Sequence, residues 1–336
     1  MIMSRRGFIV GSVGVVCAAA ASDGPDGSNH VSKLGALGKV VGELPPGRYD
    51  THVHVYHGEA KPGDLVASLR EAGLVGACIF SEPPFKLGKT YPEPLPPEQA
   101  VDRVIEWASG SPTIYPFYWI DPVRDDACEL VDMAVEKGIY GFKVIRSEGR
   151  PVDEKSLPVY RRIAHHGKPV TFHSGILWDG RPSSENFRPA NWEGLLAVPG
   201  LRFALAHISW PWCDECIAVY GKLLNAMLNN AGKVPEMFID TTPGTPRIYR
   251  RDALTKLFTV GYDIRDHIMF GCDCGTAGYN VKWVKDWLAV DDGIYAELGL
   301  DEGWPDSIYR KSLCRYLFGG DNSKRSIPTP DGVSPR

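Results

Sequence analysis

An alternation of short apolar segments with longer amphipathic ones begins at Tyr49, and it constrains the fold more than any other feature of the chain. Short runs rich in β-branched and aromatic residues predict buried strands, and the longer periodic runs predict helices. Eight strand-then-helix units are typical of a (β/α)8 barrel, whose catalytic groups lie at the C-terminal ends of the strands. An open doubly wound sheet is the alternative, but no glycine-rich phosphate-binding motif follows the first predicted strand. The predicted strands are Tyr49–Val55, Leu74–Phe80, Thr113–Ile120, Ile139–Ile145, Pro169–His173, Leu201–His207, Met237–Thr241 and His267–Asp273.

Helices are predicted between these strands and after the last one, so residues 47–320 form a single barrel with no room for a second domain. Residues 22–46 are rich in Gly, Ser and Pro and are predicted to be a linker. Residues 321–336 are predicted to be a C-terminal tail. The predicted helices are Glu98–Ala108, Ala127–Glu136, Leu157–His165, Cys216–Asn229, Asp252–Val260, Val281–Leu288 and Pro305–Phe318.

Residues 1–21 have the layout of an export signal. Arg5 and Arg6 precede an apolar run from Phe8 to Val16, and small residues follow it. Paired arginines at this place are typical of the twin-arginine route, so we expect the twin-arginine export machinery to be a partner and the mature protein to lie in the periplasm or outside the cell. A general secretory signal or a lipoprotein anchor at Cys17 is the alternative. The run is shorter than the ~20 residues that span a bilayer, so no permanent membrane anchor is expected.

The composition argues against two classes of protein. The chain holds 37 Lys and Arg against 41 Asp and Glu, a net charge of −4, whereas dedicated nucleic-acid binders carry a strongly basic surface. Hydrophobic residues make up 43% of the chain, which is too many for intrinsic disorder over most of its length. We therefore expect a globular protein whose partner is a small molecule rather than a nucleic acid.

Polar side chains suited to bind a metal occur on the first predicted strand. Because side chains alternate along a strand, Asp50, His52 and His54 are expected on one face. Two imidazoles at positions i and i+2 can each reach one ion at about 2.1 Å, which is a common zinc arrangement. A single His in an apolar strand is more often a hydrogen-bonded core residue, so the pair carries more weight than either member.

Further candidate ligands end three other predicted strands. His173 ends the fifth, His207 ends the sixth and Asp273 ends the eighth, each as the first strongly polar residue after an apolar run. In a (β/α)8 barrel all of these positions meet at one face. The pattern therefore predicts a metal-dependent active site at the C-terminal ends of the strands.

These motifs resemble the amidohydrolase superfamily, specifically its amidohydrolase-related branch. The resemblance rests on His52-x-His54, Phe172-His173-Ser174-Gly175, Ala206-His207 and Phe270-Gly271-Cys272-Asp273, together with Gly141-Phe142-Lys143-Val144 and Gly167-Lys168-Pro169-Val170.

The resemblance implies a distorted barrel with one divalent metal ion per chain, usually zinc, with manganese or a second ion as the alternatives. It implies that His52, His54, His173 and Asp273 are metal ligands and that Asp273 also handles the proton of the attacking water. His207 is implied to act as an acid or base or to polarise the substrate carbonyl. A homodimer is also common in this branch.

Two departures from the family pattern bear on the substrate. Cys272 and Cys274 flank Asp273, where the family often has Gly-Ser-Asp-x-Pro. The segment Ser209-Trp210-Pro211-Trp212-Cys213 after the sixth strand is also unusual.

Three functions are compatible with this pattern. A metal with an open coordination position activates water and polarises a carbonyl, so the leading prediction is hydrolysis of an amide, lactone or ester bond in a small cyclic or aromatic molecule. One branch of the same family instead decarboxylates aromatic or unsaturated acids with the same ligands. The third function is a catalytically inactive ligand-binding barrel, although a pure binder has no need of four convergent metal ligands.

Lys143 ends the fourth predicted strand, and two roles are open for it. Several members of the superfamily carry a carbamylated lysine there that bridges two metals, which requires a lowered amine pKa. The branch that the sequence resembles is usually mononuclear, and Lys143 then binds a substrate carboxylate or forms a structural ion pair.

Several residues after the strands are candidates for substrate contact. Tryptophans in such positions favour a flat or aromatic substrate, and arginines suit a substrate carboxylate. The candidates are His57, Trp119, Trp178, Trp210, Trp212, Arg146, Arg181 and Arg247.

The eight cysteines include the closely spaced pairs Cys213/Cys216 and Cys272/Cys274. Three interpretations stay open for these pairs: disulfides formed around export, free thiols in loops or at the pocket, and a thiolate metal site.

Overall fold

The computed structural model describes residues 43–56, 59–86, 93–230 and 234–321. The predicted export signal, nearly all of the predicted linker and tail, and His57 lie outside the described residues. No helix in the described part is both long and apolar enough to cross a membrane.

One parallel sheet forms the centre of the described chain, with the order β8-β7-β6-β5-β4-β3-β2-β1-β9. From β1 to β8, each strand pairs in parallel with the next strand along the sequence, as a βα repeat requires. The strands are β1 (Tyr49–His54), β2 (Gly76–Phe80), β3 (Ile114–Trp119), β4 (Gly141–Val144), β5 (Pro169–Phe172), β6 (Arg202–Leu205), β7 (Glu236–Asp240), β8 (Ile268–Met269) and β9 (Cys274–Gly275).

The sheet closes at the eighth predicted strand, of which Ile268–Met269 is a strand (β8), and at a second short strand, β9, which begins directly after the predicted end at Asp273. β8 pairs with β7, and β9 pairs with β1 on the other side. Between β8 and β9, the backbone N–H of Thr51 donates to Phe270 O at 2.9 Å, and that of Asp273 donates to His52 O at 2.9 Å. One stretch of chain thus bridges both edges of the sheet, and the predicted distorted (β/α)8 barrel is confirmed.

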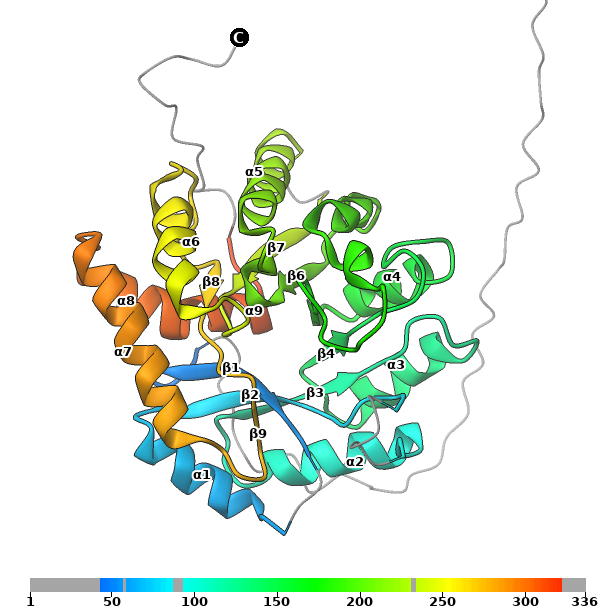
Figure 1. Ribbon diagram of the computed structural model, residues 1–336. Helices are drawn as coiled ribbons and strands as arrows, with labels where there is room; N and C mark the ends of the chain where they lie inside the picture. The colour runs from blue at the N-terminus through cyan, green and yellow to red at the C-terminus, as the bar shows by residue number, and fades with distance from the viewer. Residues whose placement is uncertain (1–42, 57–58, 87–92, 231–233, 322–336) are drawn as a thin grey trace, which may run out of the picture. The chain divides into compact units, whose positions relative to one another are not determined.

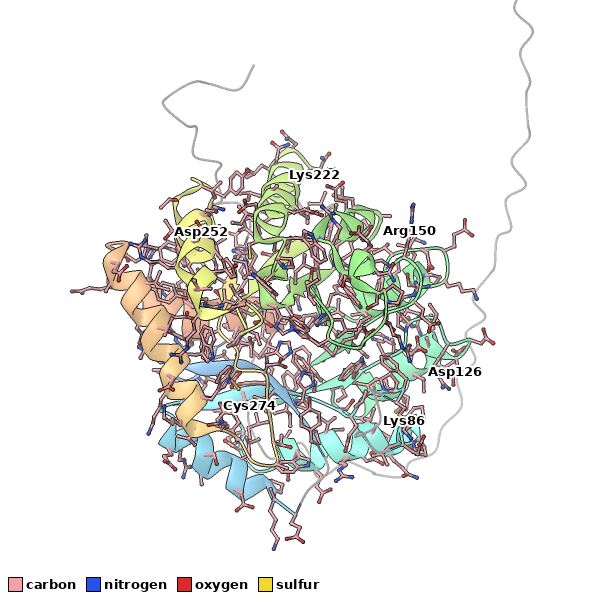
Figure 2. All side chains as sticks on the ribbon, in the orientation of Figure 1. Lys86, Asp126, Arg150, Lys222, Asp252 and Cys274 are labelled. Carbon is pink, nitrogen blue, oxygen red and sulfur yellow. The ribbon has the colours of Figure 1, made fainter. Side chains whose placement is uncertain are left out.

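Helices surround the curled sheet, and Figure 1 shows α1 to α7 on its outer side. The charged side chains labelled in Figure 2 lie at the periphery of the molecule, whereas Cys274 lies in its central part. The helices are α1 (Pro62–Glu71), α2 (Pro97–Ala108), α3 (Ala127–Glu136), α4 (Leu157–His165), α5 (Cys213–Asn229), α6 (Arg247–Thr259), α7 (Val281–Glu297), α8 (Trp304–Asp306) and α9 (Ser312–Phe318), with short 3₁₀ segments at Ser184–Phe187, Pro189–Ala197 and Ala206–Ser209 and a π-helical turn at Ser307–Lys311.

The largest difference from the predicted helices is α1, which the sequence pattern did not indicate. Only Leu65 and Leu69 of this helix are buried, so its apolar period is weak. Residues at its own N-terminus determine where the helix begins. Pro62 lies in its first turn, and the Asp64 carboxylate accepts a hydrogen bond from the backbone N–H of Lys61 at 2.8 Å. Other differences concern ends: α5, α6 and α7 are longer than predicted, and the last predicted helix is divided into three pieces.

The two larger apolar cores of the described residues lie on the two sides of the sheet. The larger core lies between the sheet and the helices, as in Val53, Ile79 and Phe142. The smaller core fills the barrel below the site, where Tyr316 of α9 stacks on Phe117 at 6.2 Å between ring centroids. Because α9 and aromatic side chains fill that interior, the open cavity lies at the C-terminal ends of the strands.

Candidate active site

Six polar side chains from five parts of the barrel converge on one cavity of about 540 Å³. They come from β1, from the C-terminal end of β4, from the segments that follow β5 and β6, and from the link between β8 and β9. This volume suits a small-molecule ligand. The six are His52, His54, Lys143, His173, His207 and Asp273.

Three of the six have the spacing of ligands to one ion. Asp273 Oδ1 lies 3.2 Å from His54 Nε2 and 3.6 Å from His52 Nε2. Two ligands that each lie ~2.1 Å from a tetrahedral ion are separated by about 3.4 Å, so these distances fit a divalent metal. Among the described residues, this trio is the one group whose ligand atoms all lie within 4.8 Å of one another.

His173, the fourth predicted ligand, lies in the same cavity but outside this trio. Its ring centroid is 5.0 Å from that of His207. Its Nε2 atom is buried and has no hydrogen-bond partner, so a donor or an ion at the centre of the cavity would satisfy it.

Two of the converging residues have a strained backbone. Asp273 has φ 61°, and His207 has φ 63° in a run of three residues with positive φ that ends at Ser209. Such conformations cost about 1–3 kcal/mol each in non-glycine residues and occur most often at functional sites. At position 244 a Cβ would lie 2.8 Å from the His207 Cβ, so Gly244 leaves the room that this ring needs.

The electrostatics of the cavity favour neutral imidazoles. Burial lowers the pKa of His52, with a further lowering from Lys143, and burial also lowers the pKa values of His54, His173 and His207. Neutral imidazole is the form that binds metals.

Asp273 is the one carboxylate among the six. Its side chain is 41% exposed toward the cavity. Desolvation alone would raise its pKa, but the hydrogen bond with His54 and the fields of His52 and His207 outweigh it and hold the pKa below its usual range. Asp273 is therefore a carboxylate that is ionised at neutral pH.

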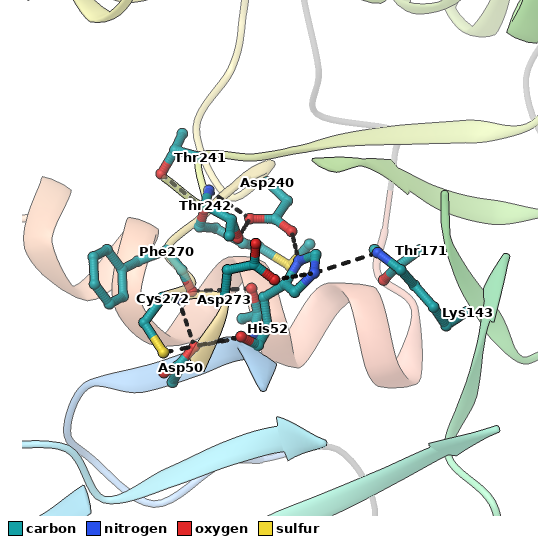
Figure 3. Close-up of polar contacts among 12 residues, drawn as sticks. Asp50, His52, Lys143, Thr171, Asp240, Thr241, Thr242, Phe270, Cys272 and Asp273 are labelled. Carbon is teal, nitrogen blue, oxygen red and sulfur yellow. Dashed lines mark hydrogen bonds and ion pairs between the residues drawn. The ribbon is translucent and has the colours of Figure 1, made fainter. Parts of the chain in front are cut away.

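Lys143 has no carboxylate partner within 4 Å in the described chain. Its Nζ atom lies 3.3 Å from His52 Nε2 and 5.0 Å from the centre of the Phe80 ring. Burial lowers its pKa to about 8. The structural ion pair that the sequence left open is therefore absent among the described residues. Figure 3 shows Nζ of Lys143 beside the His52 ring, and Lys143 lines the cavity.

Asp240, which was not predicted from the sequence, contacts the His52 ring at Nδ1, the nitrogen that does not face Asp273. Its Oδ2 atom lies 2.6 Å from His52 Nδ1, and both side chains are 1% exposed (Figure 3). Asp240 is the last residue of β7 and directly follows the apolar residues 237–239, which is the same pattern that marked His173 and His207, so this pattern was sufficient to find it.

Asp50 does not share a face with the two histidines, so that prediction is wrong. Asp50 pairs with Ala77 and Val53 pairs with Ile79, so β1 uses three residue steps where β2 uses two. This bulge reverses the alternation. The buried Asp50 carboxylate instead accepts hydrogen bonds from the hydroxyl of Tyr279 at 2.7 Å and from the backbone N–H of Cys272 at 3.0 Å.

The walls of the cavity are mostly apolar and aromatic. Trp119, Trp178 and Trp210 line it as placed by the sequence, with Trp178 82% exposed at the mouth. Tyr56, which sequence reasoning missed, stacks on His54 at 5.7 Å between ring centroids. Trp212 is not among the lining residues and instead faces the Arg188 guanidinium at 5.4 Å.

The arginines suggested for a substrate carboxylate do not line this cavity. Arg146 donates to Asp153 at 2.7 Å and lies with Arg181 in a smaller neighbouring cavity. Arg247 lies 3.7 Å from Asp286 and above the Trp287 ring. Among the described residues, Lys143 is thus the one Lys or Arg that lines the main cavity.

The two cysteine pairs are free thiols, as are all the described cysteines. The disulfide interpretation is therefore wrong. Burial raises the pKa of Cys213 to about 11 and that of Cys216 to about 12, so both are neutral thiols. Neither pair belongs to a candidate metal group in the described chain.

Comparison with solved structures supports the fold. A provisionally assigned 2-pyrone-4,6-dicarboxylic acid hydrolase from Pseudomonas putida is similar at a TM-score of 0.55 and 16% identity, over 82% of this chain and 98% of that one. A provisionally assigned metal-dependent hydrolase from Lactobacillus casei ATCC 334 is similar at a TM-score of 0.50 and 14% identity, over 77% of each chain. No protein-family model and no curated protein matches the sequence.

Fold and cavity together define a (β/α)8-barrel protein whose C-terminal face carries a group of side chains suited to a divalent metal. The barrel fold is thus shared with two solved structures that are described as hydrolases, at 14% and 16% sequence identity.

Proposed function

We propose that this protein is a metal-dependent hydrolase of the amidohydrolase type that cleaves an amide, lactone or ester bond in a small cyclic or aromatic molecule. The observation that carries the proposal is the spacing of His52 Nε2, His54 Nε2 and Asp273 Oδ1 at the base of an aromatic cavity. The solved structures of similar fold described as hydrolases support it further.

His52, His54 and Asp273 would hold the ion, with the unpartnered Nε2 of His173 available as a further ligand. A bound divalent ion, most simply one zinc per chain, supplies a Lewis acid and lowers the pKa of water toward neutrality.

Asp273 and His207 carry the proton and charge movements in this proposal. The ionised Asp273 carboxylate accepts a proton from the attacking water and returns it to the leaving group. His207, whose buried ring lines the cavity, stabilises the charge that develops on the substrate carbonyl oxygen. The aromatic walls exclude bulk water and hold a flat substrate against these groups.

The test is metal content and turnover of the full-length chain with a panel of aryl esters, lactones and anilides. We expect about one zinc per chain by mass spectrometry, loss of turnover after chelation and recovery on adding zinc or manganese. Full turnover in a metal-free preparation would contradict the proposal. A content near two ions per chain would instead support a carbamylated Lys143 as a bridge.

Decarboxylation of an aromatic acid is a second candidate, and Lys143 is the observation that favours it. Its Nζ lies on the cavity, 3.3 Å from a candidate ligand, where it can pair with a substrate carboxylate. Product mass separates the two reactions, because hydrolysis adds water and decarboxylation removes carbon dioxide.

We also propose that the chain is exported by the twin-arginine machinery, on the evidence of Arg5 and Arg6. Replacing both with lysine in the full chain should retain it in the cytoplasm, as measured by cell fractionation. Unchanged export of this variant would favour the general secretory route.

A further inference from the structure

Asp240 and His52 form a pair that neither the sequence pattern nor the comparisons assigned to a function. Asp240 ends β7, and His52 lies on β1, so the barrel brings together side chains 188 residues apart. The contact is 2.6 Å from carboxylate oxygen to ring nitrogen, and both side chains are 1% exposed. A short hydrogen bond between buried groups is strong and directional.

Asp240 is itself held in one orientation. Thr242 donates its backbone N–H to Asp240 Oδ1 at 2.8 Å and its hydroxyl to the same oxygen. The other oxygen, Oδ2, is left to accept from His52. An ionised carboxylate can only accept, so the hydrogen of a neutral His52 ring lies on Nδ1 while Asp240 is ionised.

This assignment leaves Nε2 of His52 with a lone pair, and Nε2 lies on the cavity side. It is 3.6 Å from Asp273 Oδ1 and 3.3 Å from Lys143 Nζ. A lone pair on this nitrogen is what a metal ligand requires.

We infer that Asp240 is a positioning residue that fixes His52 in the Nδ1–H tautomer, so that Nε2 is presented as a ligand to a divalent cation. The role in metal binding rests on the proposed function, whereas the tautomer is a property of the metal-free chain. Carboxylates that orient ligating histidines in this way commonly change metal affinity 10–100-fold when they are removed.

The variant Asp240→Asn tests the inference because an amide has one oxygen that accepts and one NH₂ group that donates, whereas both oxygens of the carboxylate accept. The backbone N–H of Thr242 cannot turn away, so the amide oxygen of the variant stays at Thr242 and its NH₂ faces His52. His52 Nδ1 must then accept, which moves the ring hydrogen to Nε2 and blocks the ligand atom.

Glu236 supplies a matched control on the same strand. It is also a buried carboxylate that contacts an imidazole, with Glu236 Oε1 2.8 Å from His267 Nε2, but it begins β7 whereas Asp240 ends it. The variant Glu236→Gln therefore removes an equivalent charge far from the candidate ligands.

Two measurements on the full chain test the inference. Nitrogen-15 NMR of the metal-free protein, with the His52 signal assigned from a His52→Gln variant, should report Nδ1–H in the unaltered chain and Nε2–H in Asp240→Asn. Competition with a chelating dye should show zinc affinity about 10–100-fold weaker in Asp240→Asn and unchanged in Glu236→Gln.

An Nε2–H tautomer in the unaltered chain would overturn the inference, even if the variant fails to fold. Equal zinc affinity of Asp240→Asn and the unaltered chain would also overturn it. If the unaltered chain binds no zinc, the proposed function fails, and the tautomer shift alone then decides the role of Asp240.

Discussion

The backbone of Gly271 passes so close to His52 that a Cβ at position 271 would lie 2.5 Å from the His52 Cβ and 2.3 Å from Thr242 Oγ1. Gly271 lies between β8 and β9, in the stretch that closes the barrel onto β1. The absence of a side chain there lets the two ends of the sheet meet beside the candidate metal ligands.

We therefore expect Gly271→Ala to push His52 and Thr242 apart. Such overpacking typically costs about 1–3 kcal/mol, which urea unfolding will measure. The displaced His52 should also lower the zinc content. Gly293→Ala is the control, because its Cβ meets nothing within 4 Å in α7 and the change should leave zinc content unchanged. Equal stability of Gly271→Ala and the unaltered chain would show that the barrel closes by another contact.

Asp273→Asn should lower turnover while the protein stays folded. The amide cannot accept a proton from water, and loss of a general base typically costs about 10²–10⁴-fold in rate. The rate on the best substrate of the panel and the circular dichroism spectrum are the measurements. Asp301→Asn, at an exposed ion pair with Arg265, should keep full activity. Retained turnover of Asp273→Asn would exclude the proton-transfer role.

Tyr279→Phe should destabilise the closure of the barrel, because the Tyr279 hydroxyl donates to the buried carboxylate of Asp50 at 2.7 Å. Removing one donor to a buried charge costs about 1–3 kcal/mol. Thermal unfolding measures the loss. Tyr249→Phe serves as the control, since Tyr249 is 52% exposed and should tolerate the change. Equal melting temperatures of both variants would rule out this contribution.

Glu236 should make the fold sensitive to acid. Burial alone would raise its pKa, but hydrogen bonds from His267 and Arg315 outweigh it and lower the pKa from 4.5 to about 2. A carboxyl whose pKa is lower in the folded state stabilises the fold above its unfolded pKa, and this stability is lost as the pH falls from 4.5 toward 2. The shift corresponds to about 3 kcal/mol. Urea unfolding between pH 4.5 and 2 should show that the free energy of unfolding falls less steeply with pH in Glu236→Gln than in the unaltered chain. An equal fall in both proteins would contradict this role of Glu236.

The free thiols of the described cysteines can be tested by counting reactive thiols under denaturing conditions. The unaltered chain should give the same number of reactive thiols with and without prior reduction, because the described cysteines form no disulfide. A gain of two thiols on reduction would instead reveal one disulfide.

Strand-end polar residues could be predicted because they depend on local pattern alone. His173 follows the apolar strand β5, and any barrel assignment sends such a residue to the C-terminal face. The same reasoning placed Trp119, Trp178 and Trp210 at the cavity. It placed Trp212 and Arg247 there too, but the start of a helix after a strand can turn a side chain away, and period alone does not reveal this.

Contacts between distant strands could not be predicted, and Asp240 with His52 is the clearest case. The register of β7 against β8, and the closure of β8 and β9 onto β1, bring these residues together. The bulge in β1 likewise depends on its pairing with β2, and it turned Asp50 away from the cavity. The alternation of side chains along a strand, read from the sequence, does not reveal where a bulge inserts an extra residue.

By itself the sequence determined the barrel, the face on which the site lies and the residue types that could hold a metal. It did so because strand periodicity and the parallel βα repeat restrict where each side chain points. Only the tertiary structure decided which of those residues approach one another within ligand distance and which buried carboxylate orients His52. Those relationships depend on sheet closure and register, which arise from packing between segments far apart in the chain.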